Sequence, residues 1–219
     1  MDYIKYFNEF TTLLRKAEKK EMSVHDCFSR FLMLFSLSLE TANTKVLCLD
    51  DSKLEEKYLS EVRLSHAPEM YAKAFSILVN ALTSYPGDFL GGYEMSIAGP
   101  GKRHVGQCYT PDAISQLLAK CVIPLKSPSK SKPIVISEPS CGSGSLIIAA
   151  TEQLKKLGYG KKDFYFVAND IDDKSVQMAF IQCTLLDIPV EFHTGDTLKQ
   201  EYWYRRPTLA YILNHGYRR

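Results

Sequence analysis

The sequence predicts an α/β protein in which a helical region, residues 1–98, precedes a domain with a parallel, doubly wound sheet, residues 106–219. Three observations lead to this prediction. Apolar residues recur at helical spacing before residue 105, short apolar runs alternate with helical segments after it, and a glycine-rich loop follows the first of those runs. The Gly/Pro-rich stretch at 99–105 is expected to connect the two parts.

The first region is predicted to form about four helices. Their apolar stripes are Tyr3, Phe7, Phe10 and Leu14; Phe28, Phe31, Leu32, Phe35 and Leu39; and Tyr71, Phe75, Leu78, Val79 and Leu82. Ser23 is a candidate N-cap, and Pro68 suits a first helical turn. Such stripes are typical of packing faces, so we assign them no chemistry.

The second region alternates strands with helices. Thr110, Pro111 and Asp112 indicate the N-cap and first turn of a helix over 111–123. The elements expected after it are a strand at 134–137, a helix at 145–157 that stops at Gly158, a strand at 164–168, a helix at 173–186, and strands at 190–193 and 209–213. Right-handed crossovers would place the helices on the faces of a parallel sheet and the loops at the carboxyl ends of its strands.

Composition excludes several classes of protein. The 219 residues include 27 basic and 25 acidic side chains, and the net charge of +2 neither demands nor excludes a nucleic-acid partner. The six cysteines form no C-x-x-C pair, and no histidine cluster has metal-ligand spacing, so we expect reduced thiols, no metal and a cytoplasmic protein. No apolar run is long enough to cross a membrane, and the first residues do not resemble a signal peptide.

The loops after the strands carry the candidate site. Gly142 and Gly144 let the backbone turn sharply where the next helix begins, as in a cradle for a cofactor. The third glycine of a dinucleotide fingerprint is missing at Ile147, and there is no Walker loop. Asp170 follows the second strand, where a carboxylate can accept hydrogen bonds from two ribose hydroxyls, and Asp196 follows the third, where it can accept one from an adenine amino group.

Each of these residues also has a simpler interpretation. The glycines suit any turn between a strand and a helix, Asp170 or Asp172 could cap a helix, and Asp196 could stabilise a turn. Three such loops on successive strands are harder to explain by packing alone. This pattern favours a Rossmann-like, cofactor-binding sheet.

The motifs, taken in order, resemble those of the N-6 adenine DNA methyltransferases, especially the modification subunits of type I restriction-modification systems. DFLGGYEM at 88–95 is similar to the family's D-x-L-G-x-x-Y-E, and GQCYTP at 106–111 to its G-Q-F-Y-T-P. EPSCGSG at 138–144 resembles D-P-x-C-G-S-G, with Glu138 in place of aspartate, and ANDID at 168–172 and GDTL at 195–198 follow in the family's order.

The resemblance implies S-adenosylmethionine as the cofactor and assigns roles to individual residues. Asp170 would hold the ribose and Asp196 the adenine amino group, while Gly142 and Gly144 would lie against the methionine part. The other residues implied to line the cofactor pocket are Tyr109, Thr110, Pro111, Glu138 and Pro139.

In the family, the fourth strand runs directly into Asn-Pro-Pro-Tyr or Asn-Pro-Pro-Phe. Here the run at 209–213 is followed by Asn214-His215-Gly216-Tyr217. The resemblance therefore implies that Asn214 accepts hydrogens from the amino group of a flipped adenine and that Tyr217 stacks on the base. His215 and Gly216 replace two prolines, so we expect a degenerate catalytic loop.

The resemblance also implies a shortened C-terminus, a possible specificity subunit or homodimer mate, and weak DNA binding through patches such as Lys102-Arg103 and Arg218-Arg219. Three hypotheses remain open at this point: a divergent or partner-dependent adenine methyltransferase, an inactive methyltransferase-like module with a regulatory or anti-restriction role, and an unrelated small-molecule enzyme. Cofactor titration separates the third from the others, and transfer of a labelled methyl group separates the first two.

Overall fold

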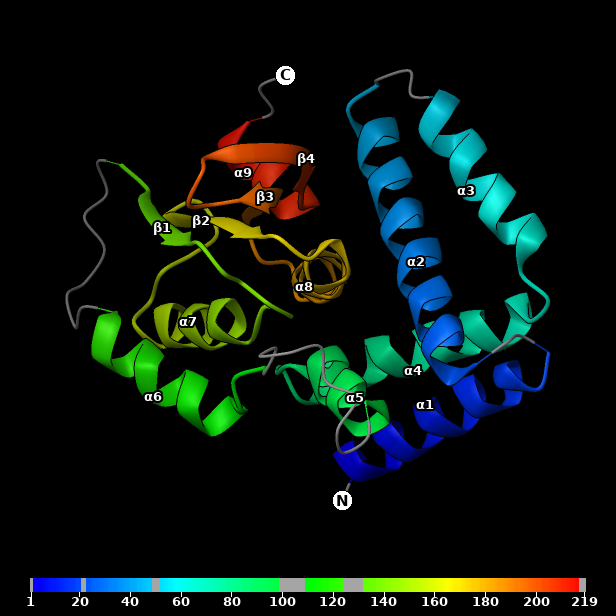
Figure 1. Ribbon diagram of the computed structural model, residues 1–219. Helices are drawn as coiled ribbons and strands as arrows, with labels where there is room; N and C mark the ends of the chain where they lie inside the picture. Colours follow the sequence, from blue (N-terminus) through cyan, green and yellow to red (C-terminus); the bar gives the residue numbers. More distant parts are fainter. Residues whose placement is uncertain (1, 21–22, 49–51, 99–108, 124–131, 217–219) are drawn as a thin grey trace. The chain divides into compact units, whose positions relative to one another are not determined.

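A computed structural model describes the chain except for residues 1, 21–22, 49–51, 99–108, 124–131 and 217–219 (Figure 1). The chain folds as two compact units, residues 1–103 and 104–219. Within the described residues, no helix is long and apolar enough to span a membrane.

The first unit contains five helices among its described residues, one more than we predicted. They are α1 (Asp2–Glu18), α2 (Val24–Val46), α3 (Ser52–Leu64), α4 (Pro68–Ser84) and α5 (Phe89–Ile97). The predicted cap of α2 is confirmed, because the Ser23 hydroxyl accepts a hydrogen bond from the Asp26 N–H at 3.1 Å. Pro68 occupies the first turn of α4, also as predicted.

The core of this unit is aromatic. The Phe10 ring lies 4.9 to 5.3 Å from the rings of Phe31, Phe89 and Tyr93, centroid to centroid, and all four side chains are buried. Asp88 caps α5 by accepting a hydrogen bond from the Gly91 N–H at 2.9 Å. The DFLGGYEM segment therefore has a structural role, because it caps a helix and fills this core.

The second unit is built on a sheet of four strands in the order β1 (Ile134–Glu138), β2 (Phe164–Asp170), β3 (Val190–Asp196) and β4 (Glu201–Pro207). Its helices are α6 (Asp112–Val122), α7 (Ser145–Lys156), α8 (Asp173–Leu185) and α9 (Leu209–His215). β1, β2 and β3 are parallel, which confirms the predicted succession of strands and helices from α6 to β3.

The predicted fourth parallel strand at 209–213 is wrong. These residues belong to α9, and β4 lies earlier in the chain and runs antiparallel to β3. Thr208 decides the outcome, because its hydroxyl accepts a hydrogen bond from the Tyr211 N–H at 3.3 Å and so caps a helix. A short apolar run does not distinguish a buried strand from a buried helix, whereas the aromatic run EYWYRRP suits a strand.

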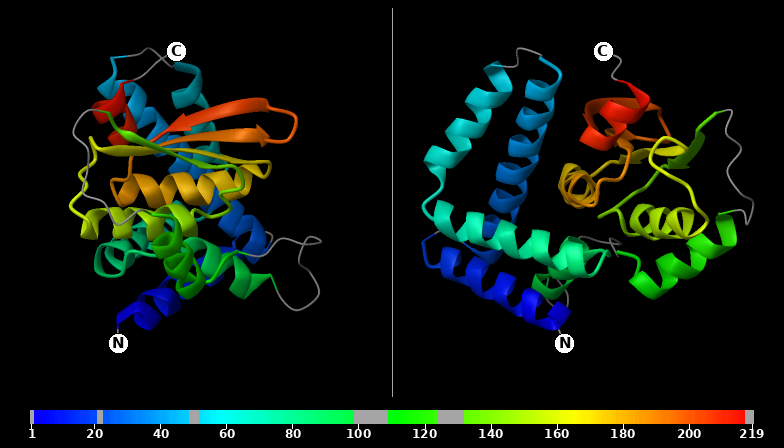
Figure 2. Two further views of the ribbon diagram at one scale, coloured as in Figure 1. Left: turned by 90° about the vertical axis from the view of Figure 1, so that its left-hand side faces the viewer. Right: turned by 180° about the vertical axis from the view of Figure 1, so that it is seen from behind.

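The helices lie on both faces of the sheet (Figure 2). α7 and α8 cover one face, where Phe180 of α8 packs against Phe192 of β3 with ring centroids 6.4 Å apart. α9 lies on the other face, and the rings of Tyr211 and His215 pack on Tyr165 of β2 at 5.4 and 4.8 Å. The sheet therefore has helices on both faces, although β4 departs from the parallel order.

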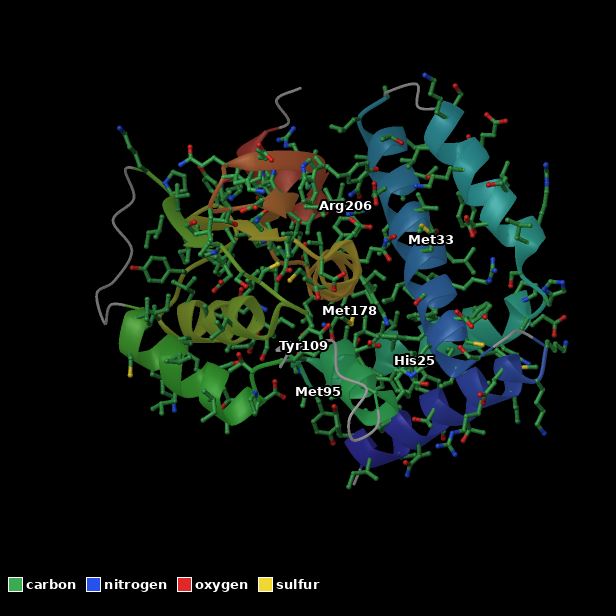
Figure 3. All side chains as sticks on the ribbon, in the orientation of Figure 1. His25, Met33, Met95, Tyr109, Met178 and Arg206 are labelled. Atoms are coloured by element: carbon green, nitrogen blue, oxygen red, sulfur yellow. The ribbon has the colours of Figure 1, made fainter. Side chains whose placement is uncertain are left out.

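Two ionic contacts fix β4 in place. Arg206 of β4 (Figure 3) donates to the Asp173 carboxylate of α8 at 2.5 Å. Burial raises the pKa of Asp173, but the hydrogen bond and charge of Arg206, together with hydrogen bonds from Thr194 and Gln177, lower it overall. On the other face, Glu191 of β3 pairs with Arg205 and lies 3.4 Å from His193. Hydrogen bonds from His193, and then from Tyr211 and Arg205, lower the pKa of Glu191 to about 2.

Replacing Thr208 by valine should destabilise the protein by about 2–4 kcal/mol, because a buried hydroxyl that serves several backbone groups is lost while the shape is kept. The Thr208 hydroxyl donates to the Ile188 carbonyl at 2.7 Å and accepts from the N–H groups of Val190 and Tyr211. Urea unfolding measures the loss. Thr83→Val is the matched control, since the exposed Thr83 hydroxyl bonds only within its own helix, and it should change stability by less than about 0.5 kcal/mol. Equal effects of the two changes would contradict this role of Thr208.

Candidate cofactor site

The carboxyl ends of the three parallel strands meet at one edge of the sheet, and the Asp170 carboxylate joins two of their loops. One oxygen, Oδ2, accepts a hydrogen bond from the Gly142 N–H at 2.8 Å, and the other, Oδ1, accepts one from the Asp172 N–H at 3.0 Å. Each carboxylate oxygen has two lone-pair sites, so Asp170 can accept further hydrogen bonds from a ligand. Its side chain is largely buried, and this geometry holds the carboxylate in a fixed position.

The loop from β1 into α7 depends on its glycines. Gly142 and Gly144 have φ angles of +53° and +93°, which side chains with a Cβ rarely adopt. A Cβ on Gly144 would lie 3.2 Å from the Cβ of Ala179, so this glycine also lets α7 and α8 approach each other. A Cβ on Gly142 would lie 3.4 Å from the Tyr109 ring. The loop therefore packs closely against Ala179 on one side and against Tyr109 on the other.

The segment from Tyr109 to Pro111 is attached to the same loop. The Tyr109 hydroxyl (Tyr109 is labelled in Figure 3) lies 3.2 Å from Ser175 Oγ at the start of α8. The Thr110 carbonyl accepts a hydrogen bond from the Ser145 hydroxyl at 3.1 Å, at the start of α7. Pro111 is the N-cap residue of α6, so the expected Thr110 cap is wrong by one position and the helix begins at Asp112.

Asn169, for which the sequence predicted no role, connects all three loops. Its Nδ2 donates to the Gly195 carbonyl at 2.9 Å and also to the Thr197 hydroxyl. The Thr197 hydroxyl donates in turn to the Pro139 carbonyl at 2.7 Å. Asn169 is buried, and among the described residues nothing bonds to its Oδ1. The only signal in the sequence was a polar residue beside Asp170 near the end of an otherwise apolar strand.

Asp196 occupies the turn after β3 and stabilises it. Its Oδ1 accepts from the N–H groups of Leu198 and Lys199 at 3.0 and 3.2 Å, and the Lys199 ammonium lies 3.3 Å from Oδ2. The backbone hydrogen bond from Lys199 is the main cause of its lowered pKa. A Cβ on Gly195 would collide with the Glu201 carbonyl, so the hairpin requires glycine there. The simpler interpretation of Asp196 as a residue that stabilises a turn therefore applies, and its Oδ2 keeps capacity for a further hydrogen bond.

Glu138 and Asp172 complete the acidic groups at this edge. Burial raises the pKa of Glu138, the charge of Asp170 raises it further, and a hydrogen bond from the Ser140 N–H at 3.2 Å opposes both effects. Asp172 caps α8 by accepting from the N–H groups of Lys174 and Ser175. Four carboxyl groups, those of Glu138, Asp170, Asp172 and Asp196, therefore lie in the strand ends and loops at this edge. No group of acidic, histidine or cysteine side chains suited to a metal ion occurs within the described ranges.

The structure does not bring Asn214 to this edge. Asn214 lies in α9, where its Nδ2 donates to the Ala210 carbonyl at 2.8 Å. The adjacent His215 contacts the Lys161 carbonyl at 2.7 Å, just before β2 begins, and its ring packs on Tyr165. Tyr165 precedes Asp170 by five strand residues, or about 16 Å along the strand. Tyr217 lies outside the described residues.

The fold is that of a Rossmann-like α/β protein in which the loops after three parallel strands meet at one end of the sheet. Residues 92–216, more than half of the chain, match the family model described as N-6 DNA methylase. The chain belongs to this family. Among curated proteins, none matches it.

Two solved structures are similar to the chain. A candidate class I S-adenosylmethionine-dependent methyltransferase from Listeria monocytogenes is 18% identical with a TM-score of 0.52, over 89% of this chain and 54% of that one. The methyltransferase subunit of a type I restriction-modification system from Streptococcus thermophilus is 12% identical with a TM-score of 0.47, over 92% of this chain and 60% of that one. The chain thus spans little more than half the length of each. The first likeness shows that the fold is that of S-adenosylmethionine-dependent methyltransferases.

Replacing Glu138 by glutamine should stabilise the protein at pH 7. A carboxyl whose pKa is raised by folding stabilises the folded state when protonated, and its ionisation costs stability as the pH rises through the folded pKa. Glutamine removes this cost and keeps an acceptor for the Ser140 N–H. Thermal unfolding should therefore show a higher midpoint for Glu138→Gln at pH 7, and the difference should shrink at pH values below the ordinary glutamate range. Glu152→Gln, at an exposed ion pair on α7, is the control and should show little change. A midpoint for Glu138→Gln at or below that of the parent at pH 7 would rule out a cost of ionisation.

Proposed function

We propose that the protein binds S-adenosylmethionine at the edge formed by the carboxyl ends of β1, β2 and β3, as the cofactor-binding part of an N-6 adenine DNA methyltransferase. The observation that carries the proposal is the Asp170 carboxylate, which is fixed by the Gly142 and Asp172 N–H groups and has acceptor capacity left for two ribose hydroxyls.

The other residues at this edge fit the same cofactor. S-adenosylmethionine presents hydrogen-bond donors at its ribose, its adenine amino group and its α-ammonium group, and the edge presents acceptors. Asp196 would accept from the adenine amino group. Glu138, whose pKa is raised by burial and which pairs with no cation among the described residues, suits the positively charged ammonium group. Asn169 Oδ1 is a buried acceptor for which the described chain provides no donor.

The remaining pocket residues would supply shape. The turn at Gly142 and Gly144 leaves no side chain between the backbone and the methionine part of the ligand. Tyr109 would form a wall against Gly142, while Thr110, Pro111 and Pro139 would complete the lining through their backbone positions. When bound, the cofactor supplies a methyl group activated by a sulfonium. The chain's own residues orient the cofactor and exclude water from it.

The proposed substrate is the exocyclic amino group of adenine in DNA, as the family implies. Transfer to it requires acceptors for the amino hydrogens beside the methyl group. Asn214, the residue proposed for this task, is held in α9 near the opposite end of β2. We therefore propose that the chain alone binds the cofactor without efficient methyl transfer, and that transfer depends on a partner such as a specificity subunit or on a rearrangement of α9.

A second candidate function rests on the same observation. If α9 stays where it is, the protein is a methyltransferase-like module that binds the cofactor and regulates a methylation or restriction system without carrying out chemistry. Both candidates require cofactor binding, and methyl transfer distinguishes them.

Replacing Asp170 by asparagine should weaken S-adenosylmethionine binding roughly tenfold to a hundredfold, because a charged acceptor is lost from the ribose and from the Gly142 loop. Isothermal titration calorimetry at pH 7 measures the affinity directly. Glu152→Gln removes a carboxylate from α7 away from the edge and should bind as the parent does. If Asp170→Asn and the parent have equal affinity, the cofactor does not lie at Asp170.

Methyl transfer from labelled S-adenosylmethionine to adenine in mixed-sequence DNA should be slow or undetectable with the isolated chain. Asn214→Ala should leave cofactor affinity unchanged, since the Asn214 side chain donates a hydrogen bond within its own helix, away from the proposed cofactor. The double change His215→Pro and Gly216→Pro tests whether the family's loop can be restored. Rapid transfer by the parent that Asn214→Ala abolishes would show that Asn214 reaches the methyl group and that α9 moves.

A further inference from the structure

The contacts around the candidate site form a closed network, and Ser175 completes it. The Asp170 carboxylate accepts hydrogen bonds from the Gly142 N–H on one side and from the Asp172 N–H on the other. The Ser175 hydroxyl donates to Asp172 Oδ2 at 2.7 Å, and the Tyr109 hydroxyl lies 3.2 Å from Ser175 Oγ. The Tyr109 ring packs against Gly142, which closes the network. Residues from three segments of the chain therefore hold one another in place.

The direction of the hydrogen bond between Tyr109 and Ser175 follows from the chemistry of the groups. A serine hydroxyl has one proton to donate, and Ser175 donates it to the Asp172 carboxylate, which can only accept. Ser175 Oγ therefore accepts from the Tyr109 hydroxyl. A hydroxyl that donates to a carboxylate is also a stronger acceptor, so Asp172 strengthens the hold of Ser175 on Tyr109.

The backbone beside Tyr109 is held separately, by two serines on other helices. The Ser145 hydroxyl of α7 donates to the Thr110 carbonyl at 3.1 Å. Because its proton is used there, Ser145 Oγ accepts from the Ser115 hydroxyl of α6, which lies 2.7 Å away. Both serines are buried. The backbone is thus fixed without Ser175, and the contact with Ser175 acts on the orientation of the Tyr109 side chain.

Helix capping alone does not account for Ser175. The cap of α8 consists of the Asp172 carboxylate and the N–H groups of Lys174 and Ser175, and these bonds do not involve Tyr109. The Ser175 side chain is fully buried, and Tyr109 reaches it from 66 positions earlier in the chain. A residue needed only for the cap would not require this distant contact.

We propose that Ser175 is a positioning residue for the cofactor, because its hydroxyl fixes the Tyr109 ring against Gly142 before the methionine part of the ligand binds there. Ser175 does not touch the ligand itself and acts through Tyr109. This inference rests on the proposed cofactor site, in which the methionine part lies against the turn at Gly142 and Gly144. It assigns a role in binding to a residue of α8 that lies outside the motifs at 106–111, 138–144, 168–172 and 195–198.

The effect on binding follows from the freedom of the Tyr109 side chain. A tyrosine side chain rotates about χ1 and χ2, and a ligand that packs against its ring must hold it in one orientation. Ser175 holds the ring in place beforehand, so less freedom is lost when the methionine part binds. The nucleoside part, which Asp170 and Asp196 would bind, does not depend on this ring. The contribution of Ser175 is therefore specific to ligands that carry an amino-acid part.

Tyr109→Phe is the first test, since it keeps the ring and removes only the hydroxyl that donates to Ser175. We expect S-adenosylhomocysteine to bind this variant roughly threefold to tenfold more weakly than the parent, as measured by isothermal titration calorimetry. Methylthioadenosine, which has the nucleoside and the sulfur but no amino-acid part, should bind both proteins with affinities within about twofold of each other. A general loss of structure would weaken both ligands alike, so the difference between them reports the position of the ring.

Ser175→Ala tests the same contact from the other side. It should weaken S-adenosylhomocysteine binding at least as much as Tyr109→Phe does, because Asp172 also loses a hydrogen bond. The double variant should bind no more than about twofold more weakly than Ser175→Ala alone, since the two changes remove one shared contact. Thr151→Val is the matched control. The buried Thr151 hydroxyl donates within α7 to the Ile147 carbonyl at 2.8 Å, and its loss should leave both affinities unchanged.

Three results would overturn the proposal: unchanged binding of S-adenosylhomocysteine to Tyr109→Phe, an equal loss of affinity for both ligands, or effects of the two changes that multiply in the double variant. Asp170→Asn separates this failure from that of the proposed site. If Asp170→Asn weakens both ligands but Tyr109→Phe weakens neither, the cofactor site stands and Ser175 only caps α8. If the parent binds neither ligand, the proposed function and this inference fail together. If Ser175→Ala does not fold, the two ligands measured on Tyr109→Phe decide the question.

Discussion

The hydrogen bond from the Gly142 N–H to the Asp170 carboxylate is the contact on which the candidate site depends. It joins the loop after β1 to the end of β2. These segments are far apart in the chain, so local backbone preferences cannot bring them together. Asn169, one residue earlier, adds the loop after β3 through Gly195 and Thr197. Two adjacent polar residues at the end of one strand thus set the positions of three loops, and the acceptors that remain are presented from a rigid frame.

The polar groups at this edge are not fully compensated within the described chain, and this lowers the stability of the free protein in a way that is consistent with ligand binding. Burial and the charge of Asp170 raise the pKa of Glu138 at this half-buried edge, and Asn169 keeps a buried acceptor unpaired among the described residues. Groups arranged this way destabilise the free protein and favour a ligand that brings hydrogen-bond donors and a positive charge. A surface whose only role is packing would not be expected to keep such destabilising groups.

The two outer strands of the described sheet, β1 and β4, differ in how they are held. The β4 hairpin and α9 close one side, where Arg206, Glu191 and Thr208 bind β4 and α9 to β3 and α8. On the β1 side, the described residues provide no further pairing strand, and an apolar groove lies between β1, α6 and α7. The loop with Gly142 and Gly144 follows the same strand, so this side of the sheet also carries the candidate site.

The sequence by itself determined the helical region, the order of elements from α6 to β3 and the positions of Gly142, Gly144, Asp170 and Asp196 at the ends of three strands. Periodicity, turn residues and capping residues are local properties, so they can be recognised without the fold. Three features were decided by the tertiary structure: Thr208 starting α9 where we expected a strand, Asn169 as the link between loops, and the distance of Asn214 from the site. Each depends on partners far apart in the chain, such as Thr208 with Ile188 and Val190, or Asn169 with Gly195. A short apolar run is compatible with both a buried strand and a buried helix, and at 209–213 the hydrogen bonds of Thr208 with Ile188 and Val190 stabilise the helix.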